Sequence, residues 1–215
     1  VSSALDFILP FEKYKITAGA KVSFTNTRNG INYDTSDPTL VQDDYFRYKE
    51  QIYALYADYS REYSERFSMQ LGLRMEHTRT TGISEAKDTE DKHDYTRLFP
   101  TVYLLYSPTD GHALNFSFSN RISRPSQNMV NPFPFYQNKY TYACGREDLK
   151  PSYTYNAELG YTLKNNFNVS AYYSYSDDVF FQVVDLDAET NVTSFLWENF
   201  MKTHAFGLNN SYTFR

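Results

Sequence analysis

The residues that could carry catalysis or hold a metal are few, and their spacing suits neither task. The four histidines lie far apart and show no metal-ligand spacing such as H-x-x-x-H, so solvent exposure explains them. Cys144 is the only cysteine, which excludes an internal disulfide and a zinc site built from several thiolates. Neither a G-x-S-x-G run nor a phosphate-binding P-loop occurs. We therefore predict no catalytic residue, no metal site, no cofactor and no enzyme.

Acidic residues are more densely grouped, in stretches that are predicted below to be long loops. Carboxylate clusters of this kind can bind calcium. Loops that face water are commonly charged, however, and that explanation needs no metal. The net charge of -5 and the isoelectric point near 5.4 argue against nucleic acid as a partner, because nucleic acid selects basic surfaces.

Charged residues with a possible role in binding recur within or next to segments that alternate between polar and apolar residues. The candidates are Arg74, Glu76, Arg121, Arg124 and Glu158. A dry protein core of this size could not hold such charges unpaired, so the side that carries them should be wet. The two later arginines could also clamp an anionic ligand.

A second group of candidates is aromatic and lies in the predicted loops: Phe133, Phe135, Tyr136, Tyr140, Tyr142 and Trp197. Aromatic residues form girdles where a membrane protein meets the lipid headgroups, which is the plainer explanation. Aromatic faces also stack on sugars or flat ligands, and a long loop on a rigid scaffold is a common place for recognition. The loop aromatics are therefore candidates for ligand contact.

A two-residue periodicity indicates the elements that must position these side chains. Apolar and polar residues alternate without exception over residues 14–25, 67–76 and 153–163, which predicts three long strands. Weaker alternation predicts six more strands, at residues 5–9, 53–59, 100–106, 114–118, 167–175 and 206–214. We assign the apolar side of each strand, including Tyr153, to lipid and the polar side to a watery interior.

The connections between these nine strands alternate in length. Tight turns are predicted at residues 11–13, 62–65, 108–111 and 164–166, and long loops at 26–45, 82–94 and 124–151. The last two strands should run on through Val183 and Val184 to a hairpin tip near residues 188–191. Short periplasmic turns and long extracellular loops are typical of an outer-membrane barrel, whereas a soluble Greek-key sandwich would mix the two kinds.

Composition agrees with strands and excludes membrane helices. Tyr (21) and Phe (17) supply most of the 18% aromatic content, which favours strands. The mean hydropathy is -0.62, and no stretch approaches the roughly 20 apolar residues that a spanning helix needs. A barrel strand shows only alternate residues to lipid and averages to a polar value. The chain opens at Val1 without an export signal, so we expect a mature chain or an excised segment.

Three short runs between residues 121 and 151 carry a family resemblance. They read R-I-x-R-P at 121–125, N-P-F at 131–133 and G-x-x-x-L-x-P at 145–151. Together they resemble a signature of TonB-dependent outer-membrane receptors of the outer membrane protein beta-barrel family. The family's last run continues Gly-Asn-Pro, and residues 146–148 depart from it. Similar runs extend over nearly the whole chain.

The resemblance implies a barrel of about 22 strands with a plug domain inside. Residues 1–215 would then form a partial transmembrane barrel without the plug: all-β, an antiparallel up-and-down meander of about nine strands. The implied function is a barrel-wall segment of a receptor that imports a scarce nutrient across the bacterial outer membrane. The implied partners are outer-membrane lipid, the plug of the same full-length protein, TonB indirectly, and a small-molecule or oligomeric nutrient. Arg121 and Arg124 would pair with plug carboxylates.

Two other architectures remain open at this point. A small self-contained outer-membrane barrel with an adhesin or structural role predicts a closed set of eight or ten strands. A soluble binding sandwich predicts two sheets whose apolar faces pack together, burying Phe67, Leu71, Tyr155 and Leu159. A segment of a larger wall predicts an open sheet with unpaired edges.

Overall fold

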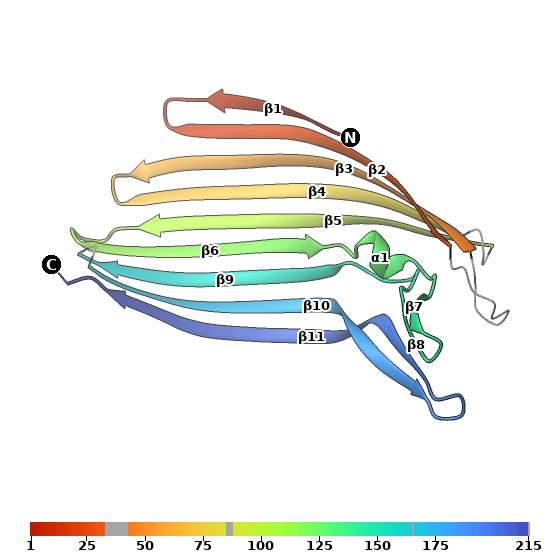
Figure 1. Ribbon diagram of the computed structural model, residues 1–215. Helices are drawn as coiled ribbons and strands as arrows, with labels where there is room; N and C mark the ends of the chain where they lie inside the picture. Colours follow the sequence, from red (N-terminus) through yellow and green to blue (C-terminus); the bar gives the residue numbers. More distant parts are fainter. Residues whose placement is uncertain (33–42, 85–87, 165, 215) are drawn as a thin grey trace.

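The computed structural model describes residues 1–32, 43–84, 88–164 and 166–214, and these form one curved sheet (Figure 1). Its nine long strands are β1 (Ser2–Pro10), β2 (Tyr14–Asn32), β3 (Asp43–Ser64), β4 (Phe67–Ser84), β5 (Thr89–Tyr106), β6 (His112–Ser123), β9 (Ser152–Leu163), β10 (Phe167–Asp187) and β11 (Val192–Tyr212). The one-turn helix α1 (Gln127–Val130) and the short strands β7 (Phe135–Asn138) and β8 (Thr141–Cys144) lie between β6 and β9. The described residues contain no helix long and apolar enough to cross a membrane.

The strands follow one another as an up-and-down meander. Neighbours pair antiparallel from β1 to β6 and on through β9, β10 and β11, and β8 and β7 extend the sheet beyond β11. The predicted fold class and the nine long strands are confirmed. Within the described residues β1 and β11 do not pair, so a small closed barrel is wrong, and a single sheet also rules out the two-layer sandwich.

The register keeps all strands in phase, so the two faces of the sheet differ in chemistry. Leu71 lies opposite Tyr59 and Val102, whereas its neighbour Gly72 lies opposite Asp58 and Thr101. No second layer of described residues covers the apolar face, and Leu71 and Leu159 remain 39% and 55% exposed. A continuous exposed apolar face of this kind suits contact with acyl chains.

The strands are longer than predicted at the end of the long loops. Two of those loops are wrong in extent, because β2 and β3 pair as far as Asn32 and Asp43, and β4 and β5 pair from Ser84 and Thr89. These extensions carry polar residues on both faces, so apolar alternation does not mark them, and the backbone ladder alone defines them. Residues 33–42 of the first loop, 85–87 of the second and residue 165 of the last predicted tight turn lie outside the described part. The tight turns at residues 11–13 and 108–111 and the hairpin tip between Asp187 and Val192 are confirmed, and the turn predicted at 62–65 lies at residues 65 and 66.

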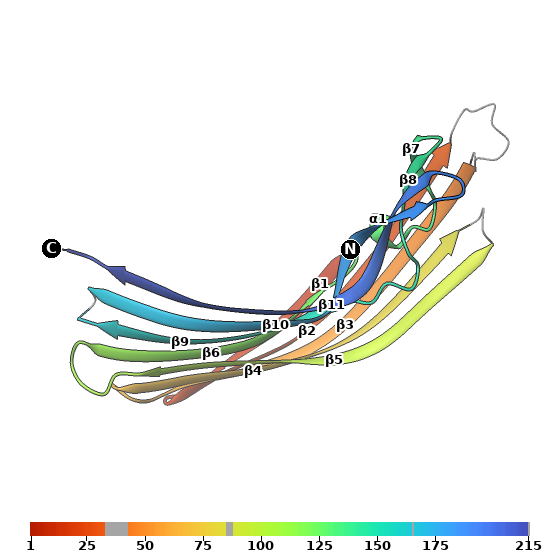
Figure 2. The ribbon, with the colours of Figure 1, turned by 90° about the horizontal axis from the view of Figure 1, so that it is seen from below.

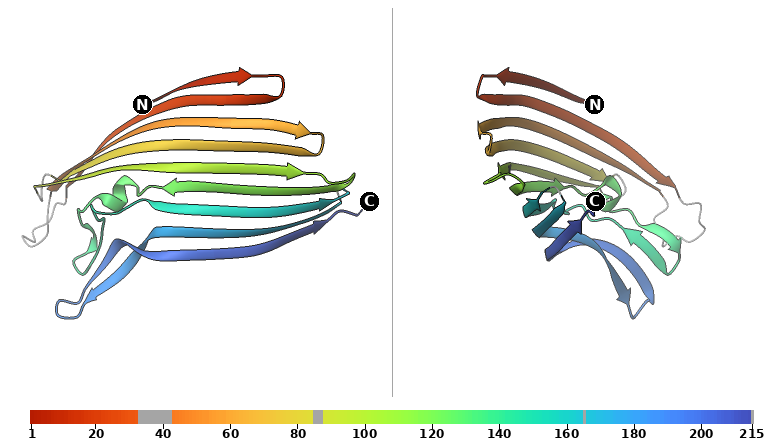
Figure 3. Two further views of the ribbon diagram at one scale, coloured as in Figure 1. Left: turned by 180° about the vertical axis from the view of Figure 1, so that it is seen from behind. Right: turned by 90° about the vertical axis from the view of Figure 1, so that its left-hand side faces the viewer.

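The sheet divides near the middle of β5. The β5–β6 ladder ends at Thr101 and Ser119, next to Pro100, which has no N–H to give to a ladder. On the far side, a register shift between Ser176 and Phe180 bends the outer halves of β10 and β11 away from the rest (Figure 1). The segment that contains α1, β7 and β8 lies at this division, on the concave side of the sheet (Figures 2 and 3).

Candidate functional site on the concave face

Glu76 of β4 lies between two arginines on the concave face. Arg74 Nε donates to Glu76 Oε1 at 2.6 Å, and Arg124 Nη2 donates to Glu76 Oε2 at 2.5 Å. Arg124 also donates to the buried Thr78 hydroxyl at 3.1 Å, and its Nε lies 3.9 Å from the Glu50 carboxylate. Glu76 is only 8% exposed, so the pairing compensates a charge that would be costly to bury alone.

Strand geometry explains why these side chains meet. Residues two apart on a strand point to the same face, which places Arg74, Glu76 and Thr78 in one row. Arg124 follows the end of β6 and precedes Pro125, and a residue before proline adopts an extended backbone. From there its guanidinium reaches β4.

The segment between β6 and β9 is anchored to the concave face by apolar packing. Val130 and Leu149 pack against Phe46 of β3, and the surrounding side chains are Tyr48, Met129, Phe180 and Trp197. Gly145 holds the segment together, because its N–H donates to the Asn131 carbonyl at 2.8 Å. A Cβ at Gly145 would come within 2.4 Å of that carbonyl oxygen, so only glycine fits there.

The run of residues 146–148, which departs from the family pattern, ties this segment to both sides of the divided sheet. The Thr89 hydroxyl of β5 donates a hydrogen bond to the Glu147 carboxylate at 2.7 Å, and His93 Nε2 lies 3.1 Å from the Glu147 carbonyl oxygen. On the other side Arg146 donates to Glu198 of β11 at 2.8 Å. The Asp148 and Glu198 carboxylates raise the pKa of Arg146, so the link stays charged.

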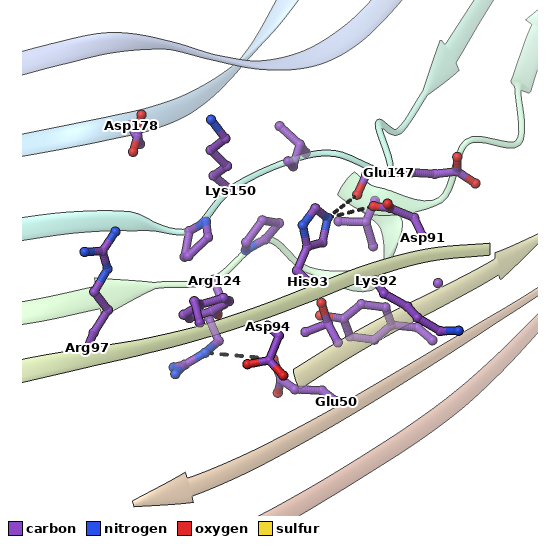
Figure 4. A pocket seen from close by; sticks show the side chains of 18 of the residues that line it. Glu50, Asp91, Lys92, His93, Asp94, Arg97, Arg124, Glu147, Lys150 and Asp178 are labelled. Carbon is purple, nitrogen blue, oxygen red and sulfur yellow. Dashed lines mark hydrogen bonds and ion pairs between the residues drawn. The ribbon is translucent and has the colours of Figure 1, made fainter. Parts of the chain in front are cut away.

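A cavity of about 350 Å³ lies where the sheet divides, enclosed by the outer halves of β3, β4 and β5, by the 124–151 segment and by β10. Charged groups of both signs line it (Figure 4). Its aromatic walls are Phe46, Tyr48, Tyr95 and Tyr153. A volume near the lower end of the usual range for ligand pockets can hold a small molecule.

The structure brings some of the predicted charged residues together and leaves one apart. Arg74, Glu76 and Arg124 form the network described above, and Arg121 lines a neighbouring hollow with Arg74 and Glu76. Glu158 lies on the concave face at another place, beside Asn115 and Gly160. Contact of any of these residues with a plug or a ligand stays a prediction.

The predicted loop aromatics mostly pack against one another. Phe133 is 1% exposed and meets Phe135 edge to face, and Tyr136 meets Tyr142 in the same way. Trp197 lies in β11 and packs edge to face on Phe180. Tyr140 at the β7–β8 turn is half exposed. Ligand contact by these residues stays a prediction.

The sequence did not predict several of the residues that line the cavity. Arg97 lies in the outer half of β5, most of which was predicted as loop, and Asp178 lies in the β10 bulge. Tyr153 was assigned to the lipid face, which is wrong, because β9 begins where the sheet divides and the ring packs under the Arg97 guanidinium at 4.9 Å. Apolar alternation does not mark residues 91–97, so the only local signal was the two-residue spacing that places 91, 93, 95 and 97 on one face of a strand.

Comparison with known proteins identifies the family. The model described as "Outer membrane protein beta-barrel family" matches residues 1–215, and no curated protein matches. The copper transporter OprC is 14% identical with a TM-score of 0.73, over 100% of this chain and 35% of OprC. The ferric enterobactin receptor of Pseudomonas aeruginosa is 15% identical with a TM-score of 0.65, over 97% of this chain and 32% of the receptor.

The FrpB iron transporter of Neisseria meningitidis is 14% identical with a TM-score of 0.61, over 99% of this chain and 34% of the transporter. The chain thus spans about one third of the length of these solved structures. At such identities the likeness shows a shared fold. The match over the full length decides membership: the chain belongs to the Outer membrane protein beta-barrel family, and its place is the bacterial outer membrane.

Proposed function

We propose that this chain is a segment of the barrel wall of a TonB-dependent receptor that imports a scarce nutrient. The observation that carries the proposal is the open meander, which superposes over its whole length on about one third of the copper transporter and iron-receptor structures. A sheet with free edges needs further strands to close, since exposed backbone groups are not tolerated in lipid.

The concave face supports the same proposal. It carries charged side chains along several strands, including Lys21, Asp58, Arg121 and Glu158, over a sheet whose other face is apolar. In a closed barrel such a face would border water or a polar plug domain. We infer that these groups contact the plug, and that energy delivered through TonB displaces the plug to pass the nutrient.

Growth and uptake of the parent bacterium test this function. The strains are the wild type, a deletion of the gene for the full-length receptor, a strain lacking TonB, and the double deletion. We expect the two single deletions to leave the same compound unconsumed in spent medium and the double deletion to add nothing. A receptor-dependent uptake that persists without TonB would contradict the proposal, as would a receptor that fractionates away from the outer membrane.

A further inference from the structure

The outer edge of β11 is covered along its outer half by another part of this chain. β8 lies parallel to it, with residues 141–144 opposite residues 193–196, and the Thr193 N–H donates to the Tyr140 carbonyl at 2.7 Å. Ser194, within this ladder, is only 6% exposed. A strand that lies along an edge prevents any other strand from pairing there.

Side-chain contacts continue this alignment beyond the short ladder. Arg146 and Glu198 continue its register, and the Arg146 guanidinium donates to the Glu198 carboxylate at 2.8 Å. Next along β11, the Asn199 side chain accepts from the Lys150 N–H at 2.8 Å and donates to the Lys150 carbonyl oxygen at 3.0 Å. The stretch 141–150 therefore follows the edge of β11 as far as Asn199.

The inner half of β11 has an open outer edge. Of the described strands, only β10 pairs with residues 201–212. On the apolar face Phe206 and Leu208 are 84% and 67% exposed, more than Leu71 and Leu159, which have a strand on each side. This inner half is long enough to cross a bilayer, which takes about 9–11 residues. Its unpaired backbone groups would lie in lipid, so this part of the edge requires a partner.

We propose that β8 holds the place of a barrel strand beside the outer half of β11, and that the strand which closes the full-length receptor docks on residues 201–212 alone. This partner continues the meander as an antiparallel strand with matching alternation. It is apolar beside Phe206 and Leu208 and small or polar beside Ala205 and Gly207. The inference rests on the proposed barrel-wall function, which requires a closing strand.

Disulfide trapping in the full-length receptor tests the position of β8. Neighbouring strands lie about 4.8 Å apart, a Cα separation that a disulfide can span. The variant Leu196→Cys places a second thiol opposite Cys144. We expect copper phenanthroline to link these two positions in isolated outer membranes, with the linked peptides identified by mass spectrometry. Leu208→Cys, on the inner half of the same strand, is the matched control and should form no link to Cys144.

Amide exchange measured by mass spectrometry tests the division of the edge. In the folded full-length receptor we expect residues 201–212 to be protected by the closing strand. The variant Ala143→Pro disrupts β8, because proline does not fit a paired strand. It should accelerate exchange within residues 193–196 by about tenfold, the effect of roughly one lost hydrogen bond. Exchange at residues 201–212 should not change.

Heat-modifiable migration on gels shows that each variant is folded. In a folded receptor, the absence of a link between positions 144 and 196 would overturn the inference. An exchange rate at residues 193–196 that Ala143→Pro leaves unchanged would do the same, because the closing strand would then cover the whole edge. Fast exchange at residues 201–212 in the unaltered receptor would instead contradict the barrel-wall function, since no strand would close the wall there.

Discussion

At the scale of single residues, the concave face combines a closed ion-pair network with a set of charges left open. Glu76 accepts hydrogen bonds from two guanidinium groups and is nearly inaccessible to water, whereas Arg97, Glu147, Lys150 and Asp178 line the neighbouring cavity without an ion pair to a described residue. The first arrangement stabilises the fold, because buried charges need partners. The second keeps its charges in contact with solvent, where they need no partner within the chain.

The variant Glu76→Gln tests the structural role of the closed network. It leaves Arg74 and Arg124 without their shared carboxylate, and we expect a loss of about 2–4 kcal/mol in the free energy of unfolding. Urea unfolding of the full-length receptor in lipid vesicles measures it. Glu158→Gln is the control, since Glu158 is exposed and forms no ion pair with a described residue, and it should stay within about 0.5 kcal/mol. Equal stabilities of the two variants would contradict the role of the network.

At the scale of elements, each long strand combines a spanning part with an outer extension. The paired strands β3 and β4 have 22 and 18 residues, about twice the 9–11 that cross a bilayer. The spanning part is defined by its two unlike faces. The extension is defined by backbone pairing alone, and it carries the cavity and the anchored 124–151 segment above the membrane.

Paired substitutions on β4 test the assignment of its faces. Leu71→Arg puts a guanidinium on the apolar face and should cost about 2–4 kcal/mol in lipid vesicles if the residue lies near the bilayer midplane. Gln70→Arg puts the same group on the concave face one residue away, and we expect less than about 1 kcal/mol. The measurement is urea unfolding of the full-length receptor. Similar costs for both variants would show that the apolar face does not meet lipid.

The β10–β11 tip gives a prediction with a pH dependence. Asp187 accepts hydrogen bonds from the Thr190 hydroxyl and from the N–H groups of Glu189 and Thr190, and these bonds lower its pKa. A lowered pKa in the folded state means that the carboxylate stabilises the tip above its ordinary pKa and loses this effect as the pH falls through the lowered value. Amide exchange at residues 189 and 190 should therefore accelerate in acid.

The variant Asp187→Ala should show that fast exchange already at neutral pH, and Asp185→Ala is the nearby control. Exchange is measured by mass spectrometry after correction for the intrinsic pH dependence of the chemistry. An unchanged rate in Asp187→Ala would show that the tip does not depend on this side chain.

At the scale of the whole molecule, the sheet is a curved wall with two different edges. Among the described strands, β8 pairs with the outer edge of β11 only over residues 193–196, where it lies parallel to it. The outer edge of β1 pairs with no described strand. An uncovered edge is a template for further strands or for aggregation.

We therefore expect residues 1–215 expressed alone to fail to form a heat-modifiable, protease-resistant species in detergent, in contrast to the full-length receptor. The physical reason is that the edges and the apolar face both remain unsatisfied without the rest of the barrel. Refolding both proteins under the same conditions and comparing their gel migration with and without heating provides the measurement. A stable monomeric species of the isolated chain would show that the wall does not need closure.

The sequence by itself determined the number of long strands, their order and the chemistry of the two faces. The reason is that an alternation of period two is local. Neighbouring residues such as Leu71 and Gly72 point to opposite faces of a strand, whichever strands pair with it. The same local information predicted short turns at one end, and the runs within residues 121–151 were enough to indicate the family.

Only the tertiary structure decided which side chains meet. Arg124 and Glu76 are 48 residues apart, and Arg124 follows β6, which is not adjacent to β4, so no pattern along the chain links them. The division of the sheet at Pro100 and the β10 bulge, which turned Tyr153 from lipid to the cavity, depends on where ladders between distant segments end. Contacts of this kind are set by register and curvature, which are properties of the assembled sheet.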